Sequence, residues 1–479
     1  MLGLATVFVA QTEIGISLAA VMRSAVLVSV LAALFIGVAW LVTRDLAKAG
    51  LVAGALMLLL RIGGADAAVT AFLLGVLCGG LLIYVNRRSA GAWRTRGTAA
   101  LNTIAGVLLV IGLGGSLFAE VASVSSVPTN EEVPFASVDA PDIHVLILDA
   151  YARADSLERV LGFDNSDFLG ELEDRGLTVA ADSRANFMYT APSLVSLFDL
   201  GHMGDAGRSI RTERQALRPS DLINRSPALE VLDRAGYETY ASIARWERES
   251  LRAADHVCAT WPMNEFELHL LRSSLIGRML DTLANGWMAA RDRSIVTAEF
   301  ACARDAADAG GDAPKFVFTH VGSPHLPVIF DRSGEAAPVD VYLDPLEVPG
   351  SKRAEVDAAY VEQLAHVNEE ALRVIDEILA SSPEPPVIIV MSDHGSWLGI
   401  GTEYDEHSDL RERFGNLFAA STPGHPNLFP DDVSIGQVLP MLFNAYLGTD
   451  IDVPDSRYFF SRTEDIFTLT EIRDPFEGS

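Results

Sequence analysis

The sequence predicts an N-terminal bundle of transmembrane helices followed by a doubly wound α/β domain, and three observations lead to this fold class. The first 120 residues are apolar and carry eight basic and four acidic side chains, whereas the rest of the 479-residue chain carries 28 basic and 60 acidic ones. In this second part, uninterrupted apolar runs of strand length recur, as in strands buried on both faces. Amphipathic helical patterns separate these runs, which is the alternation of an α/β fold.

Four apolar stretches predict transmembrane helices within residues 1–120, since a helix needs roughly 20 residues to cross a bilayer. Three of them contain no charged side chain, and these are Ser24–Val42, Ala67–Val85 and Ala99–Ala119. Ala49–Ala65 is a fourth if the Arg61 head group extends to the interface. Met1–Ala10 is apolar but short, so we expect four or five helices in this membrane domain. No basic segment precedes Met1–Ala10, which argues against a cleaved signal peptide.

The short loops between these stretches predict the orientation, because Lys and Arg are retained on the cytoplasmic side. Loops 43–48 and 86–98 contain six basic side chains, and only Arg23 and Arg61 lie on the other side. With the two loops inside, the helix that ends at Ala119 runs outward. We therefore expect an integral protein of the plasma membrane whose domain after residue 120 is extracytoplasmic.

Residues 121–142 contain Ser, Pro and acidic side chains without periodicity, which predicts a linker before a folded domain at 143–479. The acidic excess of this domain argues against nucleic acid as a partner, because the phosphates would be repelled. The domain has two cysteines, Cys258 and Cys302. Outside the cytoplasm they can form a disulfide, and two unpaired buried thiols are the alternative.

Three apolar runs predict buried strands of one sheet, namely His144–Leu148, Lys315–Thr319 and Val387–Met391. Apolar residues recur every three or four positions over Ala354–Ala380, and Ser381-Ser382-Pro383 ends the pattern. This pattern predicts a helix that packs one face on the sheet. In a doubly wound sheet, ligands bind at the carboxyl ends of the strands. The residues that follow each strand are therefore the candidates for a functional site.

Ionisable side chains follow all three strands. Asp149 follows the first strand, His320 and His325 follow the second, and Asp393 and His394 follow the third. Carboxylate oxygens and an imidazole nitrogen suit a hard or borderline divalent ion, so Asp149, Asp393 and His394 predict a metal site. A single Asp at a strand end is more often a helix cap, and a single His is more often a surface or core residue. The adjacent Asp393 and His394, with a glycine after them that lets the backbone approach closely, favour the metal site.

A fourth element begins at Thr190, where Thr190-Ala191-Pro192-Ser193 predicts the first turn of a short apolar helix. One interpretation is an ordinary capping threonine. In the other, the Thr190 hydroxyl lies at a helix N-terminus, where the dipole and the free N–H groups favour an alkoxide and a bound oxyanion. A metal ion in contact with this oxygen would lower its pKa further.

Taken in order, these motifs resemble the sulfatase-like branch of the alkaline phosphatase superfamily. They are Leu148-Asp149, Thr190-x-Pro192-Ser193-x-x-Ser196-Leu197 and Ser392-Asp393-His394-Gly395, and the resemblance covers roughly residues 140–450. Sulfatases have Cys-x-Pro-Ser-Arg at the nucleophile turn, whereas this chain has Thr190 for the Cys and Leu194 for the Arg. A membrane-anchored form with a Thr nucleophile instead resembles the lipoteichoic acid synthases and phosphoethanolamine transferases.

The resemblance implies a site built around Thr190 as the nucleophile. It implies one divalent metal ion, which is Mn, Mg, Zn or Ca, held by Asp149, Thr190, Asp393 and His394. It also implies that His325, in a turn similar to the family's Pro-His-x-Pro, holds the oxyanion of the substrate.

Three further side chains are candidates for substrate binding. Asn186 and Arg184 precede the nucleophile turn and can contact phosphoryl oxygens. Pairing of Arg184 with a local carboxylate is the alternative. His407 can protonate a leaving group, or it is an ordinary solvated histidine.

The functional hypothesis is a membrane-bound, metal-dependent, sulfatase-like hydrolase or transferase. It moves a phosphoryl-linked head group through a Thr190 ester at the outer membrane surface, with a membrane lipid or an envelope glycan as substrate. Two alternatives are a sulfatase or phosphodiesterase that acts by hydrolysis only, and a noncatalytic membrane scaffold or sensor with the same fold. The presence of Asp149, Asp393 and His394 together disfavours the scaffold.

Overall fold

The computed structural model divides into two compact units. One contains Met1–Ser126 and Met263–Trp287, and the other contains Val127–Pro262 and Met288–Ser479. The described residues are 18–45, 140–201, 219–243, 249–272, 286–342, 350–400, 404–463 and 465–477, with isolated positions between these ranges. The boundary at Ser126 falls inside the predicted linker, whereas nothing in the sequence analysis indicates that residues 263–287 group with the N-terminal unit.

The N-terminal unit contains one long apolar helix among its described residues, α2 (Leu18–Thr43). Its segment Val21–Leu41 is long and apolar enough to cross a membrane, in agreement with the predicted span Ser24–Val42. The other predicted spans fall on 49–65, 67–85 and 99–119; like residues 1–10, they lie outside the described residues except for isolated helical positions.

The same unit contains α12 (Glu265–Arg272), which lies against α2. The guanidinium of Arg23, near the N-terminal end of α2, donates hydrogen bonds to both carboxylate oxygens of Glu267. The Glu267 side chain is buried. This ion pair therefore joins the start of the first predicted span to a segment far beyond the linker in sequence.

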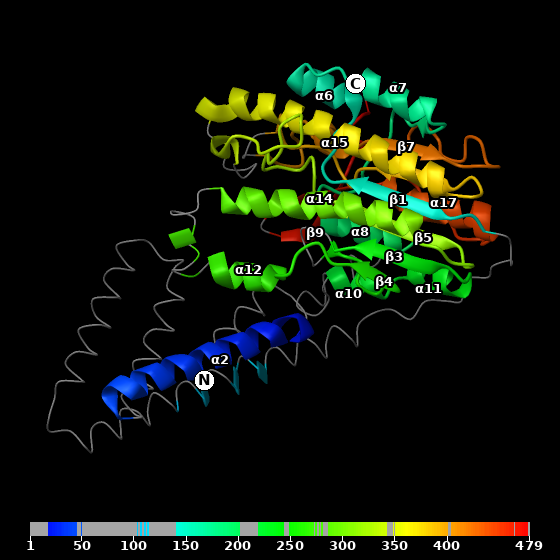
Figure 1. The fold of residues 1–479 in the computed structure, drawn as a ribbon. Helices are drawn as coiled ribbons and strands as arrows, with labels where there is room; N and C mark the ends of the chain where they lie inside the picture. Colours follow the sequence, from blue (N-terminus) through cyan, green and yellow to red (C-terminus); the bar gives the residue numbers. More distant parts are fainter. Residues whose placement is uncertain are drawn as a thin grey trace. The chain divides into compact units, whose positions relative to one another are not determined.

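The second unit is built on a seven-stranded sheet with the order β2-β7-β6-β1-β5-β3-β4 (Figure 1). The strands are β1 (Ile143–Leu148), β2 (Thr178–Val179), β3 (Glu238–Ser242), β4 (His256–Cys258), β5 (Lys315–Val321), β6 (Val387–Met391) and β7 (Phe418–Ser421). Five of them, from β6 to β4 in that order, are parallel, while β7 pairs antiparallel with both β6 and β2. The three strands predicted from the sequence are the three central ones, β5, β1 and β6.

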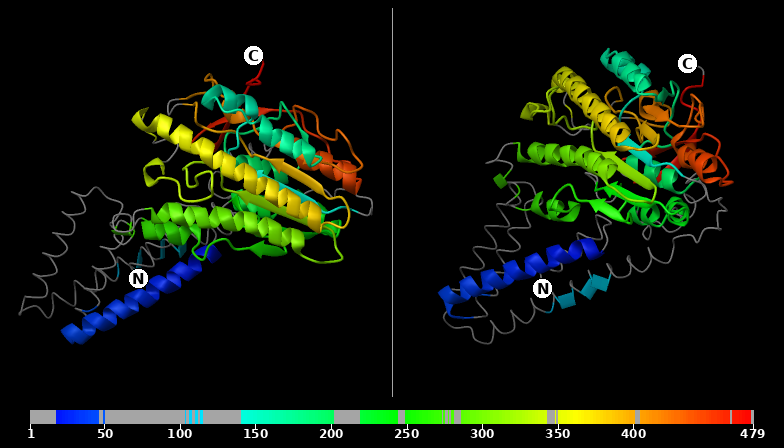
Figure 2. Two further views of the ribbon diagram at one scale, coloured as in Figure 1. Left: turned by 45° about the horizontal axis from the view of Figure 1, so that its top comes forward. Right: turned by 45° about the vertical axis from the view of Figure 1, so that its right-hand side comes forward.

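Helices cover both faces of this sheet, which confirms the doubly wound α/β class (Figure 2). One face carries α6 (Ala154–Leu161), α7 (Ser166–Asp174), α14 (Trp287–Asp308) and α15 (Arg353–Ser381). The other carries α8 (Thr190–Phe198), α10 (Pro219–Asn224), α11 (Pro227–Arg234) and α17 (Ile435–Leu447). The remaining elements are α16 (Arg411–Phe414), the 3₁₀ turns Val339–Val341 and Gly350–Lys352, and a hairpin of β8 (Tyr458–Arg462) and β9 (Asp465–Ile472).

The central strand β1 is buried on both faces, as its continuous apolar run predicts. Val145 and Ile147 pack in the layer of α8 and α17, whereas Leu146 and Leu148 pack in the layer of α14 and α15. Because side chains alternate along a strand, His144 faces the layer of α14 and α15. It is buried, and neither ring nitrogen has a hydrogen-bond partner in the described part of the chain.

A disulfide joins Cys258 at the end of β4 to Cys302 in α14, with the two Cα atoms 6.0 Å apart. This confirms the predicted pairing and excludes the alternative of two unpaired thiols. β4 is the edge strand of the sheet, so the bond ties this edge to the helix that packs next to it.

Candidate metal centre and nucleophile

The carboxyl ends of the central strands bring the predicted metal ligands together. Asp149 directly follows β1, and Asp393 and His394 lie just beyond β6, the neighbour of β1. Thr190 is the first residue of α8, on the face of the sheet that α8 and α17 cover. Four residues that are far apart in sequence therefore meet at one edge of the sheet, as the rule for doubly wound folds predicts.

The ligand atoms of these residues face one another over short distances. His394 Nε2 lies 3.1 Å from Thr190 Oγ1, 3.2 Å from Asp393 Oδ2 and 3.9 Å from Asp149 Oδ1. Asp149, Asp393 and His394 are almost completely buried, and 9% of Thr190 is exposed. The cluster is therefore almost completely shielded from bulk water.

The hydrogen bonds around the cluster leave one oxygen of each carboxylate without a partner and turn the Nε2 atom of His394 toward these oxygens. His394 Nδ1 lies 3.0 Å from the carbonyl oxygen of Gly395 and donates to it, so the Nε2 lone pair faces the cluster. Asp149 Oδ2 accepts from His320, and Asp393 Oδ1 accepts from the backbone N–H of Ala150.

The second oxygen of each carboxylate, Asp149 Oδ1 and Asp393 Oδ2, is buried and has no hydrogen-bond partner among the described residues. A buried polar atom without a partner is costly, and both of these oxygens lie within 3.9 Å of His394 Nε2. Two carboxylate oxygens and one imidazole nitrogen are the donors that a hard or borderline divalent cation takes. The residues present therefore fit the predicted metal ion.

The two carboxylates have opposite pKa shifts, because interactions with histidines outweigh burial at Asp149 and do not outweigh it at Asp393. Burial raises the pKa of Asp393 to about 6, and the neighbouring Asp149 carboxylate adds to the rise. Burial also acts to raise the pKa of Asp149, but His325 and the hydrogen bond from His320 outweigh it and hold this pKa well below its usual range. Two acidic groups this close repel each other unless a cation lies between them.

The two buried histidines, His320 and His394, differ in protonation because their neighbours carry opposite charges. Burial acts to lower the pKa of His320, but its hydrogen bond to Asp149 outweighs this and raises the pKa to about 9, so the ring is cationic at neutral pH. Burial and the charge of Arg413 hold the pKa of His394 well below its usual range. His394 is therefore neutral, which is the form that binds a metal ion.

Arg413, in α16, is a site residue that the sequence does not reveal. It is 1% exposed and donates from Nη2 to His394 Nε2 at 2.9 Å and from Nε to the carbonyl oxygen of Met188. Its guanidinium lies over the rings of Trp397 at 4.3 Å and Tyr189 at 5.6 Å. Burial lowers its pKa to about 10, so it remains a cation at neutral pH. No spacing rule distinguishes it from Arg411, which is bound to Asp409 nearby in sequence.

The local structure at Thr190 excludes the interpretation as an ordinary cap. Tyr189 is the N-cap residue, with φ −136° and ψ 149°, and it makes no side-chain capping bond. Thr190 is already helical, and its hydroxyl lies against His394 Nε2. The first N–H groups of a helix have no partner within the helix, so this turn presents donors next to the hydroxyl.

His325 lies beside the cluster. Its ring centroid is 6.4 Å from that of His394, and its Nδ1 lies 2.5 Å from the carbonyl oxygen of Leu326. The side chain is half-buried, so it lies between the cluster and solvent. This position is compatible with the predicted contact to a substrate oxyanion.

The three further candidates for substrate binding, Asn186, Arg184 and His407, differ from one another in their surroundings. Asn186 is fully buried, and its amide accepts from the Gly436 N–H and donates to the Arg457 carbonyl. The guanidinium of Arg184 is bound to Asp474 and to the Tyr458 hydroxyl, which is the predicted alternative of a carboxylate pair. His407 is exposed on the loop before α16. A structural role therefore accounts for the contacts of Asn186 and Arg184.

No protein-family model matches the sequence, and no curated protein matches it. Similar solved structures include the C-terminal periplasmic domain of EcEptC from Escherichia coli in complex with Zn, at 13% identity and a TM-score of 0.45, over 74% of this chain and 95% of that one. The C-terminal periplasmic domain of phosphoethanolamine transferase EptC from Campylobacter jejuni matches at 13% identity and a TM-score of 0.43, over 66% of this chain and 91% of that one. A 2-O GAG sulfatase matches at 14% identity and a TM-score of 0.45, over 66% of this chain and 73% of that one.

Proposed function

We propose that this chain is an integral membrane enzyme, dependent on a divalent metal ion, that transfers a phosphoryl-linked head group through an ester on Thr190. The supporting observation is the buried cluster in which the Thr190 hydroxyl and the Nε2 lone pair of His394 meet two carboxylate oxygens without hydrogen-bond partners among the described residues. The loop charges of the N-terminal third support an extracytoplasmic catalytic domain. A membrane lipid or an envelope glycan at the outer surface is the corresponding substrate class.

Asp149, Thr190, Asp393 and His394 hold the metal ion in this proposal. When bound, the ion supplies positive charge that lowers the pKa of the hydroxyl and offsets the charge of the phosphoryl oxygens. His325 and the N–H groups at the start of α8 hold those oxygens, as the donors of an oxyanion hole do. The chain thus places the nucleophile and the anion binders on separate elements that converge at one sheet edge.

Arg413 adds a permanent positive charge beside the nucleophile. Its Nη2–H group donates to the lone pair of His394 Nε2, the atom assigned to the metal ion. Coordination through that atom leaves this N–H group available to an anion. A buried guanidinium in this position therefore favours a phosphoryl group, because its donors suit tetrahedral oxyanions.

The reaction is a two-step displacement. In the first step Thr190 Oγ1 attacks phosphorus, the Oγ1–P bond forms, the bond from phosphorus to the donor alcohol breaks, and this alcohol takes up the proton that Thr190 loses. In the second step an acceptor alcohol attacks, the Oγ1–P bond breaks, and Thr190 regains a proton from the acceptor. Water in place of the acceptor gives hydrolysis, so transfer and hydrolysis differ only in the second step.

The side chain of Thr190 supports phosphoryl rather than sulfuryl transfer. Sulfatases use a formylglycine aldehyde made from Cys or Ser. Threonine carries a methyl group on Cβ, so its oxidation would give a ketone and not this aldehyde. Its hydroxyl can still attack phosphorus directly.

Mass spectrometry of the Thr190 peptide tests the proposal after the purified full-length protein, loaded with a divalent metal, is exposed to a membrane lipid extract. We expect a phosphoryl adduct on Thr190. Thr190→Ala should lose the adduct and lower turnover by about three or more orders of magnitude, whereas Thr190→Ser keeps the attacking oxygen and should retain part of both.

Ser193, one turn further along α8, is the matched control, because it is buried and carries the same hydroxyl. Ser193→Ala should leave the adduct in place. If the adduct disappears in Ser193→Ala and persists in Thr190→Ala, the nucleophile is Ser193 and the assignment to Thr190 is wrong. Faster cleavage of sulfate esters than of phosphate esters would reject phosphoryl transfer.

A further inference from the structure

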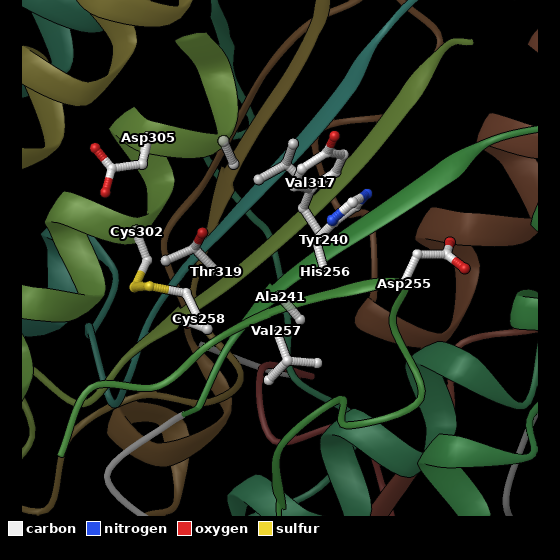
Figure 3. Close-up of a pocket in the computed structure, with 12 residues that line it drawn as sticks. Tyr240, Ala241, Asp255, His256, Val257, Cys258, Cys302, Asp305, Val317 and Thr319 are labelled. Carbon is white, nitrogen blue, oxygen red and sulfur yellow. A yellow bond between two sulfur atoms is a disulfide. The ribbon is translucent and has the colours of Figure 1, made fainter. Parts of the chain in front are cut away.

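A pocket of about 400 Å³ lies on the face of the sheet that α14 covers, over the edge strands β3 and β4 (Figure 3). Its floor consists of side chains from three neighbouring strands. Val317, Tyr240 and His256 form one row across β5, β3 and β4. Thr319 and Ser242 lie two positions further along their strands, on the same face.

The side wall of the pocket is held in place by covalent and aromatic contacts. The Cys258–Cys302 disulfide joins the floor to α14, which also contributes Asp305. The rings of Tyr240 and His256 stack with their centroids 4.3 Å apart and their planes 18° apart, so they hold each other in place. Aromatic side chains beside the floor give a ring-shaped ligand an apolar surface to pack on.

The charges around the pocket are negative. Asp305 is exposed on α14, and Asp255 lies directly before β4. The N–H and hydroxyl groups of Thr239 donate to Asp255 Oδ2 at 2.9 and 2.7 Å and lower the pKa of this carboxyl group, so it stays ionised. None of the described lining residues is Lys or Arg. A positively charged ligand is therefore favoured over an anion.

Ser242 provides a second, independent indication of a ligand. It is 2% exposed, and its Oγ has no hydrogen-bond partner in the part of the chain that the structure describes. Most buried hydroxyl groups have a partner, because burial without one costs free energy. Ser242 lines the pocket, so a ligand hydroxyl or ammonium group can supply the missing partner.

We propose that this pocket binds an amino sugar, a hydroxylated ring that carries a free ammonium group. The ammonium group pairs with Asp305, the ring packs on the Tyr240–His256 pair, and a ring hydroxyl meets Ser242 Oγ. The volume is at the lower end of the range of small-molecule sites, which suits one or two sugar rings.

The pocket is separate from the metal centre, although both use β5. Thr319 faces the pocket, whereas the next residue, His320, is bound to Asp149 on the opposite face of the strand. Binding of an amino sugar therefore does not depend on the metal ion or on Thr190. The proposal stands or falls independently of the proposed transfer reaction.

Saturation-transfer NMR of glucosamine with the full-length protein in nanodiscs tests the proposal, with N-acetylglucosamine as the neutral control of the same ring. We expect binding of glucosamine at millimolar concentration and at least about fivefold weaker binding of N-acetylglucosamine, because acetylation removes the charge. Asp305→Asn should weaken glucosamine binding to a similar degree. Asp308→Asn, also exposed near the end of α14, should leave it unchanged.

Ser242→Ala should weaken glucosamine binding, and Thr190→Ala should preserve it. Equal binding of the two sugars would overturn the proposal, and so would equal effects of Asp305→Asn and Asp308→Asn. Loss of binding in Thr190→Ala would assign the sugar to the metal centre instead. Absence of glucosamine binding in the wild-type protein would also overturn the proposal.

Discussion

His320 positions one carboxylate of the candidate metal centre. Its Nε2 lies 3.2 Å from Asp149 Oδ2, and this bond leaves Asp149 Oδ1 directed at His394 and Asp393. Partners that orient a metal ligand in this way usually contribute 10- to 100-fold to metal affinity. We therefore expect His320→Ala to weaken metal binding by about this factor, as measured by competition with a chelator.

His366→Ala is the matched control for this prediction. His366 lies in α15, and its ring packs against Phe330, away from the ligand cluster. Its removal should leave metal affinity unchanged. A similar loss in both variants would indicate general destabilisation and not a specific role of His320.

His144 makes the second unit sensitive to acid. Burial and, to a smaller degree, the charge of Lys315 lower its pKa from 6.5 to about 3. The unfolded chain therefore binds a proton at this histidine below pH 6.5, whereas the folded chain does not until about pH 3. Stability falls as the pH drops through this window, and the loss amounts to about 2 kcal/mol at pH 5.

His144→Leu should remove this loss, because leucine fills the same buried position without titrating. The melting temperature of the variant, followed by tryptophan fluorescence, should exceed that of the wild type by more at pH 5 than at pH 7.5. The other ionisable groups are the same in both proteins and cancel in this comparison. An equal difference at the two pH values would refute the assignment of acid sensitivity to His144.

At the scale of single residues, the predictable part of the site is the part that follows a local rule. Asp149, Asp393 and His394 come directly after apolar strands, and Thr190 begins an apolar helix, so their positions follow from the order of elements. Arg413 follows no such rule, because its role depends on burial against Trp397 and on the approach of two distant segments. The buried contacts of Asn186 have the same long-range origin, which is why the sequence indicates a substrate contact instead.

Among the elements, the turn after β6 is the one with the least tolerance for change. A Cβ atom on Gly395 would lie 1.8 Å from the carbonyl oxygen of Glu412 and 2.5 Å from that of Gly415, and both are backbone atoms. Gly395→Ala must therefore displace either the turn or α16. We expect a loss of about 3 kcal/mol in folding stability together with loss of metal binding, as measured by thermal melting and metal content.

Gly170→Ala is the control for this turn, because a Cβ atom at Gly170 meets no atom within 4 Å. Gly170 lies inside α7, where alanine is favoured over glycine by roughly 0.5–1 kcal/mol. This variant should match or exceed the stability of the wild type. Unchanged metal binding in Gly395→Ala would contradict the close approach of the backbone at this turn.

The strands and helices differ in how far the sequence predicts them. β6 has the predicted bounds, and α15 extends the predicted helix by one residue at each end, because long apolar or periodic runs determine both. β7 (Phe418–Ser421) and β2 (Thr178–Val179) are short and carry small or polar residues, so no pattern indicates them or their antiparallel pairing. Tertiary contacts set their pairing, which is of β7 with β6 and of β2 with β7.

On the scale of the whole molecule, the orientation in the membrane is open to a direct test. Six basic side chains in loops 43–48 and 86–98, against two on the other side, predict that the catalytic domain is extracytoplasmic. Green fluorescent protein fused after Ser479 should therefore be dark, because it does not mature after export through the general secretion route. A fusion after Asp45 should be bright. Bright fluorescence after Ser479 would reverse the orientation and the proposed substrate compartment together.

The ion pair between Arg23 and Glu267 sets an order of events while the chain is being synthesised. The two residues are 244 positions apart. A ribosome that adds about 5–20 residues per second makes Glu267 roughly 12–50 seconds after Arg23. The helix that contains Arg23 therefore exists long before the carboxylate that it finally binds. The N-terminal unit reaches its final structure only after more than half of the chain has been translated, so its maturation overlaps with the folding of the second unit.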